Sequence, residues 1–464
     1  IMIMRHFGAN SEVDSYFIAI SIIQMIITLI QSGYLSEVFL PIYVDAKKKS
    51  RSDAQLIFFS IIHRVIFFLT LLTFIFWYLA PSIFNFIGSG LNIEQKLLGS
   101  KILRYTSFLV LLTTIESFFI SVLTAEKVYG RSEITHLVNS ISSITIFILL
   151  KSHLGIYTLV LSLLFGKIMS IIISIIFFRM IGIRYKLSWR IDKKILKLLY
   201  NTSKFTSLYV ITTKIFGITL NFCASFLPEG TISIFNYARN LHIKALSIFL
   251  TPVSNVFFSE FKNSINDSEE TDFKMKIHDS LYLYIIIFSF SISTIVLYGN
   301  LVFEFIWIDK NDILKGDIST AHKMLALNFI GGIFIALSSL YRKSLIALNY
   351  ASQLYTSWIA VQLFSALYAY FSIKYFQVIG LATIPAFNFI GMSFCTFILA
   401  DKNNIPVFSL FKEILIKENL LGYILILFSF SFINTIILRN QIELQLVSYA
   451  LFSIPIIIHF FKKI

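Results

Sequence analysis

Charged residues are scarce in this sequence. Asp, Glu, Lys and Arg make up 14% of the 464 residues, whereas hydrophobic residues make up 57%. An ordinary soluble protein carries roughly 25% charged residues, and the mean hydropathy here is +0.80. This composition excludes a water-soluble fold, and the long apolar runs predict an all-α polytopic membrane protein.

Cysteine is nearly absent, which removes further classes of site. The two cysteines, Cys223 and Cys395, lie in apolar runs, so the sequence supports neither a disulfide framework nor a cysteine-based metal centre. It also lacks a Walker Gly-Lys-Ser/Thr loop, a His-Glu-x-x-His motif and any soluble segment large enough to bind a nucleotide. We therefore predict a protein that is not an enzyme and has no catalytic residues, metal or cofactor.

Basic residues outnumber acidic ones, and the net charge is +14. They collect in short loops between apolar runs and do not form one soluble face. That distribution is typical of membrane topology and does not fit a nucleic-acid-binding module. We expect the lipid bilayer to surround most of the chain, and we expect no nucleic-acid partner.

Apolar runs long enough to cross a bilayer, which takes about 20 residues of helix, recur along the chain. The residues before Arg5 are too few for a complete span, and we expect an N-terminal truncation that removes most of the first helix. The further runs lie approximately at 14–42, 54–79, 102–125, 134–150, 156–180, 203–227, 232–256, 280–297, 324–345, 358–375, 381–399, 420–437 and 446–461. With the fragment, the sequence predicts about 14 transmembrane helices.

Lysine and arginine are divided unevenly between alternate loops. About 23 fall on the side that includes Lys47 and Lys463, and about 10 fall on the other side. Cytoplasmic loops carry an excess of Lys and Arg. We therefore predict that both termini are cytoplasmic.

Similar aromatic residues recur in the two halves of the chain at a nearly constant offset. Phe39 pairs with Phe258 at 219 residues, Phe84 pairs with Phe303 at the same spacing, and Tyr129 pairs with Tyr350 at 221. Parallel repeats of this kind are a recurrent transporter architecture. They predict two pseudo-symmetric six-helix lobes, at 1–190 and 191–400, followed by two C-terminal helices at 401–464.

Charges inside the predicted spans are mostly positive. The deep set consists of one carboxylate, Glu116, and of four cations: Lys167, Lys214, Arg239 and Lys244. Intramembrane charges are costly and usually face a cavity or a partner. A cation-exporting antiporter needs carboxylates there, whereas a pyrophosphate needs Lys and Arg. The balance favours an anionic cargo and leaves coupling to the membrane potential or to a monovalent ion open.

Several short motifs occur in a fixed order. The run Arg-His-Phe-Gly-Ala-Asn at 5–10 is followed by Asp-Ser-Tyr-Phe-Ile-Ala at 14–19 and by Gly-Tyr-Leu-Ser-Glu-Val-Phe-Leu-Pro at 33–41. A second stretch has Ala-Ser-Phe-Leu at 224–227 and Tyr-Ala-Arg-Asn-Leu at 237–241. This pattern resembles the MurJ/MviN lipid II flippases of the multidrug/oligosaccharidyl-lipid/polysaccharide exporter superfamily.

The resemblance implies two lobes around a cationic cavity that moves an undecaprenyl-pyrophosphate-linked glycan outward across the bacterial inner membrane. Asp14 matches the family's acidic residue at the start of the second helix. Two positions depart from the pattern: Thr28 replaces a cavity arginine, and Arg239 lies one position early, with Asn240 at the expected place. The predicted substrate-binding residues are Asp14, Thr28, Lys167, Lys214, Arg239, Asn240 and Lys244.

These departures leave the cargo open between lipid II and an O-antigen or capsule repeat unit. A cation-coupled multidrug antiporter of the same superfamily is the main alternative function, and a non-transporting scaffold for glycan synthesis is another. The sign of the cavity charge separates them. Besides the lipid-linked glycan, the expected partners are a glycan polymerase or glycosyltransferases.

Overall fold

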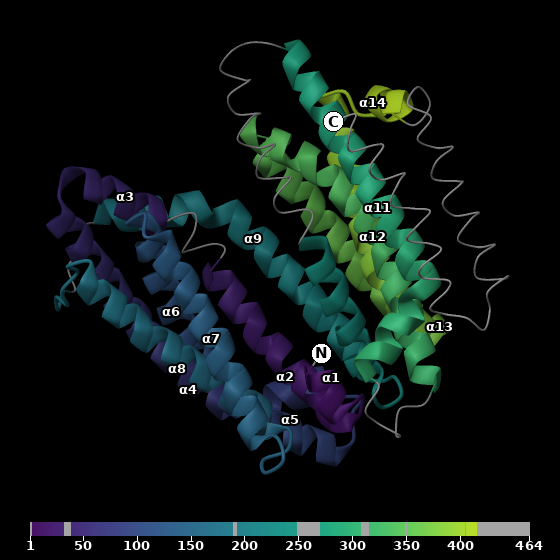
Figure 1. The fold of residues 1–464 in the computed structure, drawn as a ribbon, viewed down its shortest axis with the longest axis horizontal. Helices are drawn as coiled ribbons and strands as arrows, with labels where there is room; N and C mark the ends of the chain where they lie inside the picture. Colours follow the sequence, from purple (N-terminus) through teal and green to yellow (C-terminus); the bar gives the residue numbers. More distant parts are fainter. Residues whose placement is uncertain are drawn as a thin grey trace. The chain divides into compact units, whose positions relative to one another are not determined.

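The fold of the chain was obtained as a computed structural model (Figure 1). It describes residues 2–31, 39–188, 193–247, 270–307, 315–348, 350–403 and 405–414. Every regular element in these ranges is a helix, which confirms the predicted all-α class. The predicted spans at 420–437 and 446–461, and Phe258 of the predicted repeat, lie outside the described residues.

Many of the described helices could cross a membrane by length and composition. Seven stretches meet that criterion: Ser11–Gln31, Arg51–Ile87, Ile93–Ala125, Tyr129–Leu150, Tyr157–Met180, Asp317–Ala347 and Ala351–Lys402. Two shorter apolar helices occur at Leu208–Ala224 and Ile277–Ser291. The chain is therefore a polytopic membrane protein, and the count of 14 spans stays a prediction.

The described chain forms two compact units, Met2–Ser233 and the residues from Ile234 onward. The sequence predicts a boundary between lobes after residue 190. In the structure α9 (Lys193–Ala224) contacts α2 and α4, so it belongs to the first compact unit. The two six-helix lobes stay a prediction.

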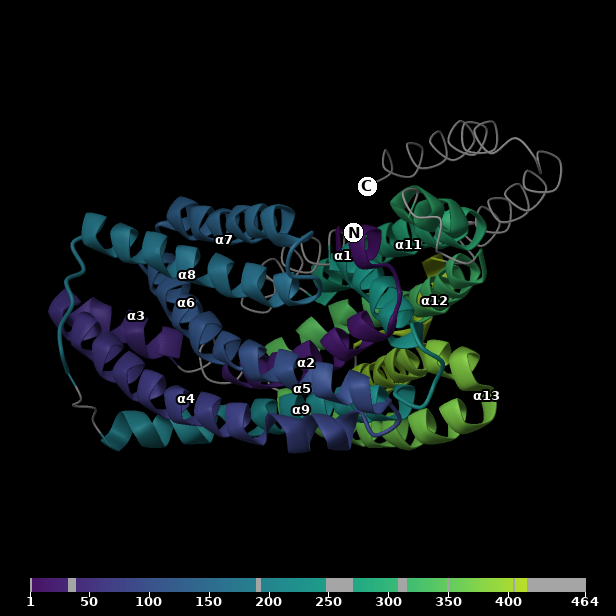
Figure 2. The ribbon, with the colours of Figure 1, turned by 90° about the horizontal axis from the view of Figure 1, so that it is seen from below.

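The first unit contains nine described helices in total. In addition to α9 they are α1 (Met2–Phe7), α2 (Ser11–Thr28), α3 (Leu40–Lys49), α4 (Arg51–Ile87), α5 (Ile93–Thr106), α6 (Phe108–Ala125), α7 (Tyr129–Leu150) and α8 (Tyr157–Met180). The start of α2 follows from local chemistry, because the side chain of Asn10 accepts a hydrogen bond from the Val13 N–H. α6 contacts both α4 and α8 and lies between them (Figure 2).

Aromatic side chains join α3, α4, α6 and α8. The ring of Phe39 meets that of Phe118 edge-on at 4.9 Å between centroids, and Phe58 lies 5.5 Å from Phe178. All four are buried. Such pairs contribute about 0.5–1.5 kcal/mol each beyond the burial of their apolar area, so this cluster holds the helix ends in a fixed arrangement.

Polar groups gather at the same end of this unit. The Tyr43 hydroxyl donates to Glu126 Oε1 at 2.9 Å, and Lys47 Nζ lies 3.0 Å from Glu126 Oε2. Arg51 Nη2 donates to the Ile181 carbonyl at 2.5 Å. Burial and the adjacent Glu126 carboxylate raise the pKa of Tyr43 above its usual range, so this hydroxyl stays a donor. We call these residues the basic end of the first unit.

The second unit contains most of a helix over 231–247, then α11 (Glu270–Trp307), α12 (Lys315–Ala347), α13 (Ala351–Lys402) and α14 (Phe408–Lys412). α12 contacts both α11 and α13. α13 is a hairpin, because Gln377 leaves the helical region at φ 48°, ψ −123°. Its two arms agree with the predicted spans 358–375 and 381–399.

Hydrogen bonds tie the two arms of α13 together. Trp358 Nε1 donates to Thr396 Oγ1 at 3.1 Å, and Asn388 Nδ2 donates to Ser365 Oγ at 2.9 Å. These groups are buried, and each bond satisfies polar atoms that apolar surroundings would otherwise penalise. The pairing fixes the register of the hairpin.

Candidate functional site

The helix over 231–247 is amphipathic, with its polar face exposed. Its exposed residues are Arg239, Asn240, Ile243, Lys244 and Ser247. At 100° per residue these five fall within about 140° of the helix circumference. The opposite side buries Phe235, Ala238, His242 and Leu246. The predicted site residues Arg239, Asn240 and Lys244 thus share one face, which we call the exposed face.

The buried side of this helix is held by α12. The His242 ring meets the Phe329 ring at 4.9 Å between centroids. A Cβ atom on Gly332 would lie 2.5 Å from His242 Nε2, so only glycine permits this close approach. The packing fixes the rotation of the helix about its axis and thereby keeps the two cations exposed.

Asp14, in the first turn of α2, contacts the start of the helix over 231–247. Its carboxylate accepts hydrogen bonds from the Gly230 N–H at 2.7 Å, from the Ser233 N–H at 2.7 Å and from the Ser233 hydroxyl at 2.5 Å. The side chain is 1% exposed. A carboxylate in this position satisfies free N–H groups and interacts favourably with the helix dipole. Asp14 therefore caps the helix that carries Arg239 and Lys244.

Lys167 forms a buried ion pair. Its ammonium group contacts Glu116 Oε2, and Glu116 Oε1 accepts a hydrogen bond from Ser170 Oγ at 2.6 Å. The Glu116 side chain is 3% exposed and that of Lys167 is 18% exposed. The two charges compensate each other in this arrangement, which joins α6 to α8.

The remaining predicted site residues lie on α2 and α9, two helices that contact each other. The Thr28 hydroxyl donates to the Gln24 carbonyl at 2.6 Å, a bond within its own helix. Lys214 lies on α9 and is half-buried. Asn221 Nδ2 donates to Ser21 Oγ at 2.6 Å and joins α9 to α2.

Sequence reasoning missed the partners of these charges. Ser170 and Ser233 are common residue types that belong to no motif, and only their position in space gives their hydroxyls a role.

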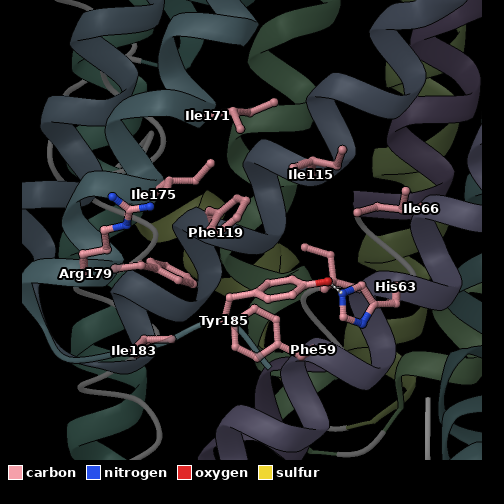
Figure 3. A pocket seen from close by; sticks show the side chains of 12 residues that line it. Phe59, His63, Ile66, Ile115, Phe119, Ile171, Ile175, Arg179, Ile183 and Tyr185 are labelled. Carbon is pink, nitrogen blue, oxygen red and sulfur yellow. Dashed lines mark hydrogen bonds between the residues drawn. The ribbon is translucent and has the colours of Figure 1, made fainter. Parts of the chain in front are cut away.

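Sequence reasoning also missed two cavities of the first unit, at opposite ends of α4 and α8. One, of about 510 Å³, is lined by Trp77, Lys101, Arg104, Tyr105 and Tyr157 among others. The other, of about 390 Å³, includes His63 and Arg179 (Figure 3).

Within the described ranges no three His, Cys, Asp or Glu side chains come together as a metal site. The polar chemistry of the exposed face is that of hydrogen-bond donors and cations. Arg and Lys on an exposed helix face suit an anionic group, Arg through paired donors and Lys as a point charge.

Comparison with known proteins gives a consistent family. The family model described as lipid II flippase MurJ matches residues 3–459. A probable lipid II flippase MurJ from Borreliella burgdorferi is 22% identical over 393 residues, which cover 83% of this chain and 76% of that protein. The lipid II flippase MurJ of Thermosipho africanus is 29% identical over 181 residues, or 38% of this chain and 37% of that protein.

Solved structures show the same fold. The inward closed conformation of a lipid II flippase MurJ is similar with a TM-score of 0.78 at 20% identity, covering 99% of this chain and 94% of that one. An inward-facing multidrug resistance transporter of the MATE family has a TM-score of 0.66 at 13% identity, with coverage of 85% and 90%. The second likeness is one of fold alone.

Proposed function

We propose that this chain, which belongs to the MurJ family of lipid II flippases, moves lipid II from the cytoplasmic to the outer leaflet of the bacterial inner membrane. The protein is a transporter and not an enzyme. The proposal assigns substrate binding to Arg239, Asn240 and Lys244, because these residues share the exposed face of the helix over 231–247.

The physical task is to take a pyrophosphate and a sugar through hydrocarbon. An unpaired charge in an apolar medium is strongly unfavourable, which makes the spontaneous event slow. A protein surface that supplies cations and hydrogen-bond donors at membrane depth lowers that cost. In this proposal Arg239 and Lys244 bind the pyrophosphate and the Asn240 amide binds a sugar hydroxyl, while the lipid tail stays in the bilayer.

The other predicted site residues have different roles in this proposal. Asp14 acts through the helix that it caps and holds Arg239 and Lys244 in position. Lys214 adds a further cation on α9. Lys167 contributes less net charge, because Glu116 compensates it. Thr28 supplies at most a hydroxyl, which cannot replace the charge of an arginine.

We further propose that the pyrophosphate and sugar of the substrate enter the protein from the cytoplasm. Both termini lie on the cytoplasmic side in this proposal, as the distribution of Lys and Arg predicts. A glycosyltransferase must supply such a substrate and a glycan polymerase must consume it, so these are the expected neighbours. An antiporter for cationic drugs is disfavoured, because its substrate would be repelled by Arg239 and Lys244.

Complementation tests the proposal. In a strain depleted of its own lipid II flippase, the chain should restore growth, and Arg239→Ala should not, at matched membrane abundance. Ile243→Ala is the matched control, since Ile243 lies on the same exposed face without a charge. A chain that never restores growth, or an Arg239→Ala variant that restores it fully, would count against the proposal.

A further inference from the structure

A largely apolar cavity of about 390 Å³ lies in the first unit (Figure 3). Its volume is in the range of roughly 300–1,000 Å³ typical of small-ligand sites. Its walls come mainly from isoleucine and phenylalanine side chains of α4, α6 and α8, such as Ile66, Phe119 and Ile171. Walls of this kind suit a hydrocarbon chain.

A non-helical segment, residues 183–188, contributes Ile183 and Tyr185 to the cavity wall. Tyr185 directs its hydroxyl at His63 Nε2, 2.9 Å away (Figure 3). His63 Nδ1 lies 3.1 Å from the Ser188 carbonyl oxygen, and the hydroxyls of Ser60 and Ser188 are 2.5 Å apart. Irregular backbone beside membrane helices is stable where side chains satisfy it or where it lines a cavity. Both conditions hold here.

The polar atoms of the cavity wall favour an anion. Arg179 lines the cavity from α8 and is exposed, while His63 lines it from α4. None of the twelve residues that line the cavity is acidic. Nearby, at the basic end of the first unit, Glu126 is engaged by Lys47 and Arg51. Arg179 is thus the charged residue of the cavity lining, and its charge is positive.

The cavity lies near the basic end of the first unit, and this position indicates which leaflet it faces. Arg51, at the start of α4, donates to the carbonyl of Ile181, just after α8, so Arg179 lies near the basic end. The distribution of Lys and Arg predicts that this end faces the cytoplasm. Anionic lipids are attracted to basic pockets between membrane helices on that side.

We propose that this cavity binds an anionic phospholipid of the cytoplasmic leaflet, with one acyl chain among the isoleucine and phenylalanine side chains and the phosphate on Arg179. A phosphodiester carries a single charge, which one arginine can match, whereas a pyrophosphate calls for more than one cation. The site is therefore distinct in chemistry from the exposed face of the helix over 231–247. The inference rests on the cavity and on the predicted orientation of the basic end, and it does not depend on the proposed substrate.

A lipid in this position contacts the connection between α8 and α9. Tyr185 and Ile183 line the cavity, and they lie on the segment that leads toward α9. Occupancy adds apolar contacts to a stretch held by the backbone hydrogen bond from the Ile183 N–H to the Phe178 carbonyl and by the contacts of Tyr185. The bound lipid is therefore expected to slow amide exchange in residues 183–188.

Native mass spectrometry of the purified full chain tests the proposal, with phosphatidylglycerol and phosphatidylcholine of identical acyl chains as probes. The unmodified protein should retain phosphatidylglycerol in preference to phosphatidylcholine. Arg179→Gln should weaken phosphatidylglycerol binding about tenfold, the loss expected for one hydrogen bond to a charged group. Arg179→Lys should keep the preference. Arg184→Gln is the matched control, since Arg184 is exposed in the same region but does not line the cavity.

A second variant tests the tail. Ile175 is 40% exposed, so Ile175→Trp should fold, fill the cavity and weaken binding of both phospholipids. Equal binding of the two phospholipids to the unmodified protein, or equal effects of Arg179→Gln and Arg184→Gln, would overturn the proposal. Displacement of phosphatidylglycerol by equimolar undecaprenyl phosphate would also overturn it and assign the cavity to the isoprenoid tail. None of these measurements depends on lipid II transport.

Discussion

The carboxylate of Asp14 accepts two hydrogen bonds from Ser233, one from its backbone N–H at 2.7 Å and one from its hydroxyl at 2.5 Å. Asp14 lies in the first turn of α2 and Ser233 in the first turn of the helix over 231–247. One side chain thus ties the start of α2 to the start of the helix that carries Arg239 and Lys244. This contact explains an acidic residue at a site whose proposed ligand is an anion.

The first prediction concerns this cap. Asp14→Ala leaves the N–H groups of Gly230 and Ser233 without their acceptor inside the protein, at about 1–3 kcal/mol for each group. Thermal unfolding in detergent should show a clear loss of stability. Asp14→Asn, which keeps one acceptor oxygen, should be intermediate, and Ser233→Ala, which removes only the hydroxyl, should be mild. If Asp14→Ala unfolds at the same temperature as the unmodified chain, the capping role is wrong.

The second prediction concerns the pair between Glu116 and Lys167. Removing one member of a buried pair typically costs about 3–5 kcal/mol, and the partial exposure of Lys167 places it at the lower end. Glu116→Gln and Lys167→Met should each destabilise the protein, whereas the double variant should lose much less than the sum. The double-mutant cycle is measured by thermal or denaturant unfolding. Additive effects would contradict the pairing.

The same cycle separates two roles of Lys167. If Lys167 mainly compensates Glu116, the double variant should retain transport, although Lys167→Met alone reduces it. If the double variant folds and is inactive, Lys167 contributes directly to substrate binding.

Most of the fold could be predicted from the sequence, because a membrane helix is encoded in its own apolar run. The predicted span 156–180 agrees with α8 to within a residue. The division into compact units was harder to predict, since it depends on which helices α9 contacts. Hydropathy shows that a helix crosses the bilayer but carries no information about its neighbours.

The candidate site was predictable in composition but only partly in geometry. Arg239, Asn240 and Lys244 follow from helical periodicity, and the structure places them on one face. The pairing of Lys167 with Glu116 joins residues 51 positions apart, and no periodicity within one helix could reveal it. Asp14 was predicted as a cavity residue from the family pattern, whereas its hydrogen bonds point to a positioning role.

The third prediction concerns the turn of α13. A Cβ atom on Gly380 would lie 2.1 Å from the Ser372 carbonyl oxygen, so Gly380→Ala must separate the two arms. Overpacking of this kind costs about 1–3 kcal/mol. Gln377→Gly should be neutral or stabilising, because Gln377 has a positive φ that glycine adopts without strain. Equal thermal stability of Gly380→Ala and the unmodified chain would contradict the close approach.

The fourth prediction concerns topology. Lys48 is exposed at the basic end, and Lys101 is exposed at the other end of the first unit. In a chain without Cys223 and Cys395, a membrane-impermeant thiol reagent should label Lys101→Cys in intact cells. It should label Lys48→Cys only after permeabilisation. The reverse pattern would place the basic end outside.

The most direct test of the central claim is lipid II translocation by the purified full chain in proteoliposomes. The cations of the exposed face must attract the pyrophosphate, so Arg239→Ala should slow translocation at least about tenfold, in line with the loss of one hydrogen bond to a charged group. Arg239→Glu should abolish it through like-charge repulsion. Thr28→Ala and Ile243→Ala should stay near the unmodified rate, since the Thr28 hydroxyl bonds within its own helix and Ile243 has no charge. Unmodified rates for Arg239→Ala and Arg239→Glu would contradict the account.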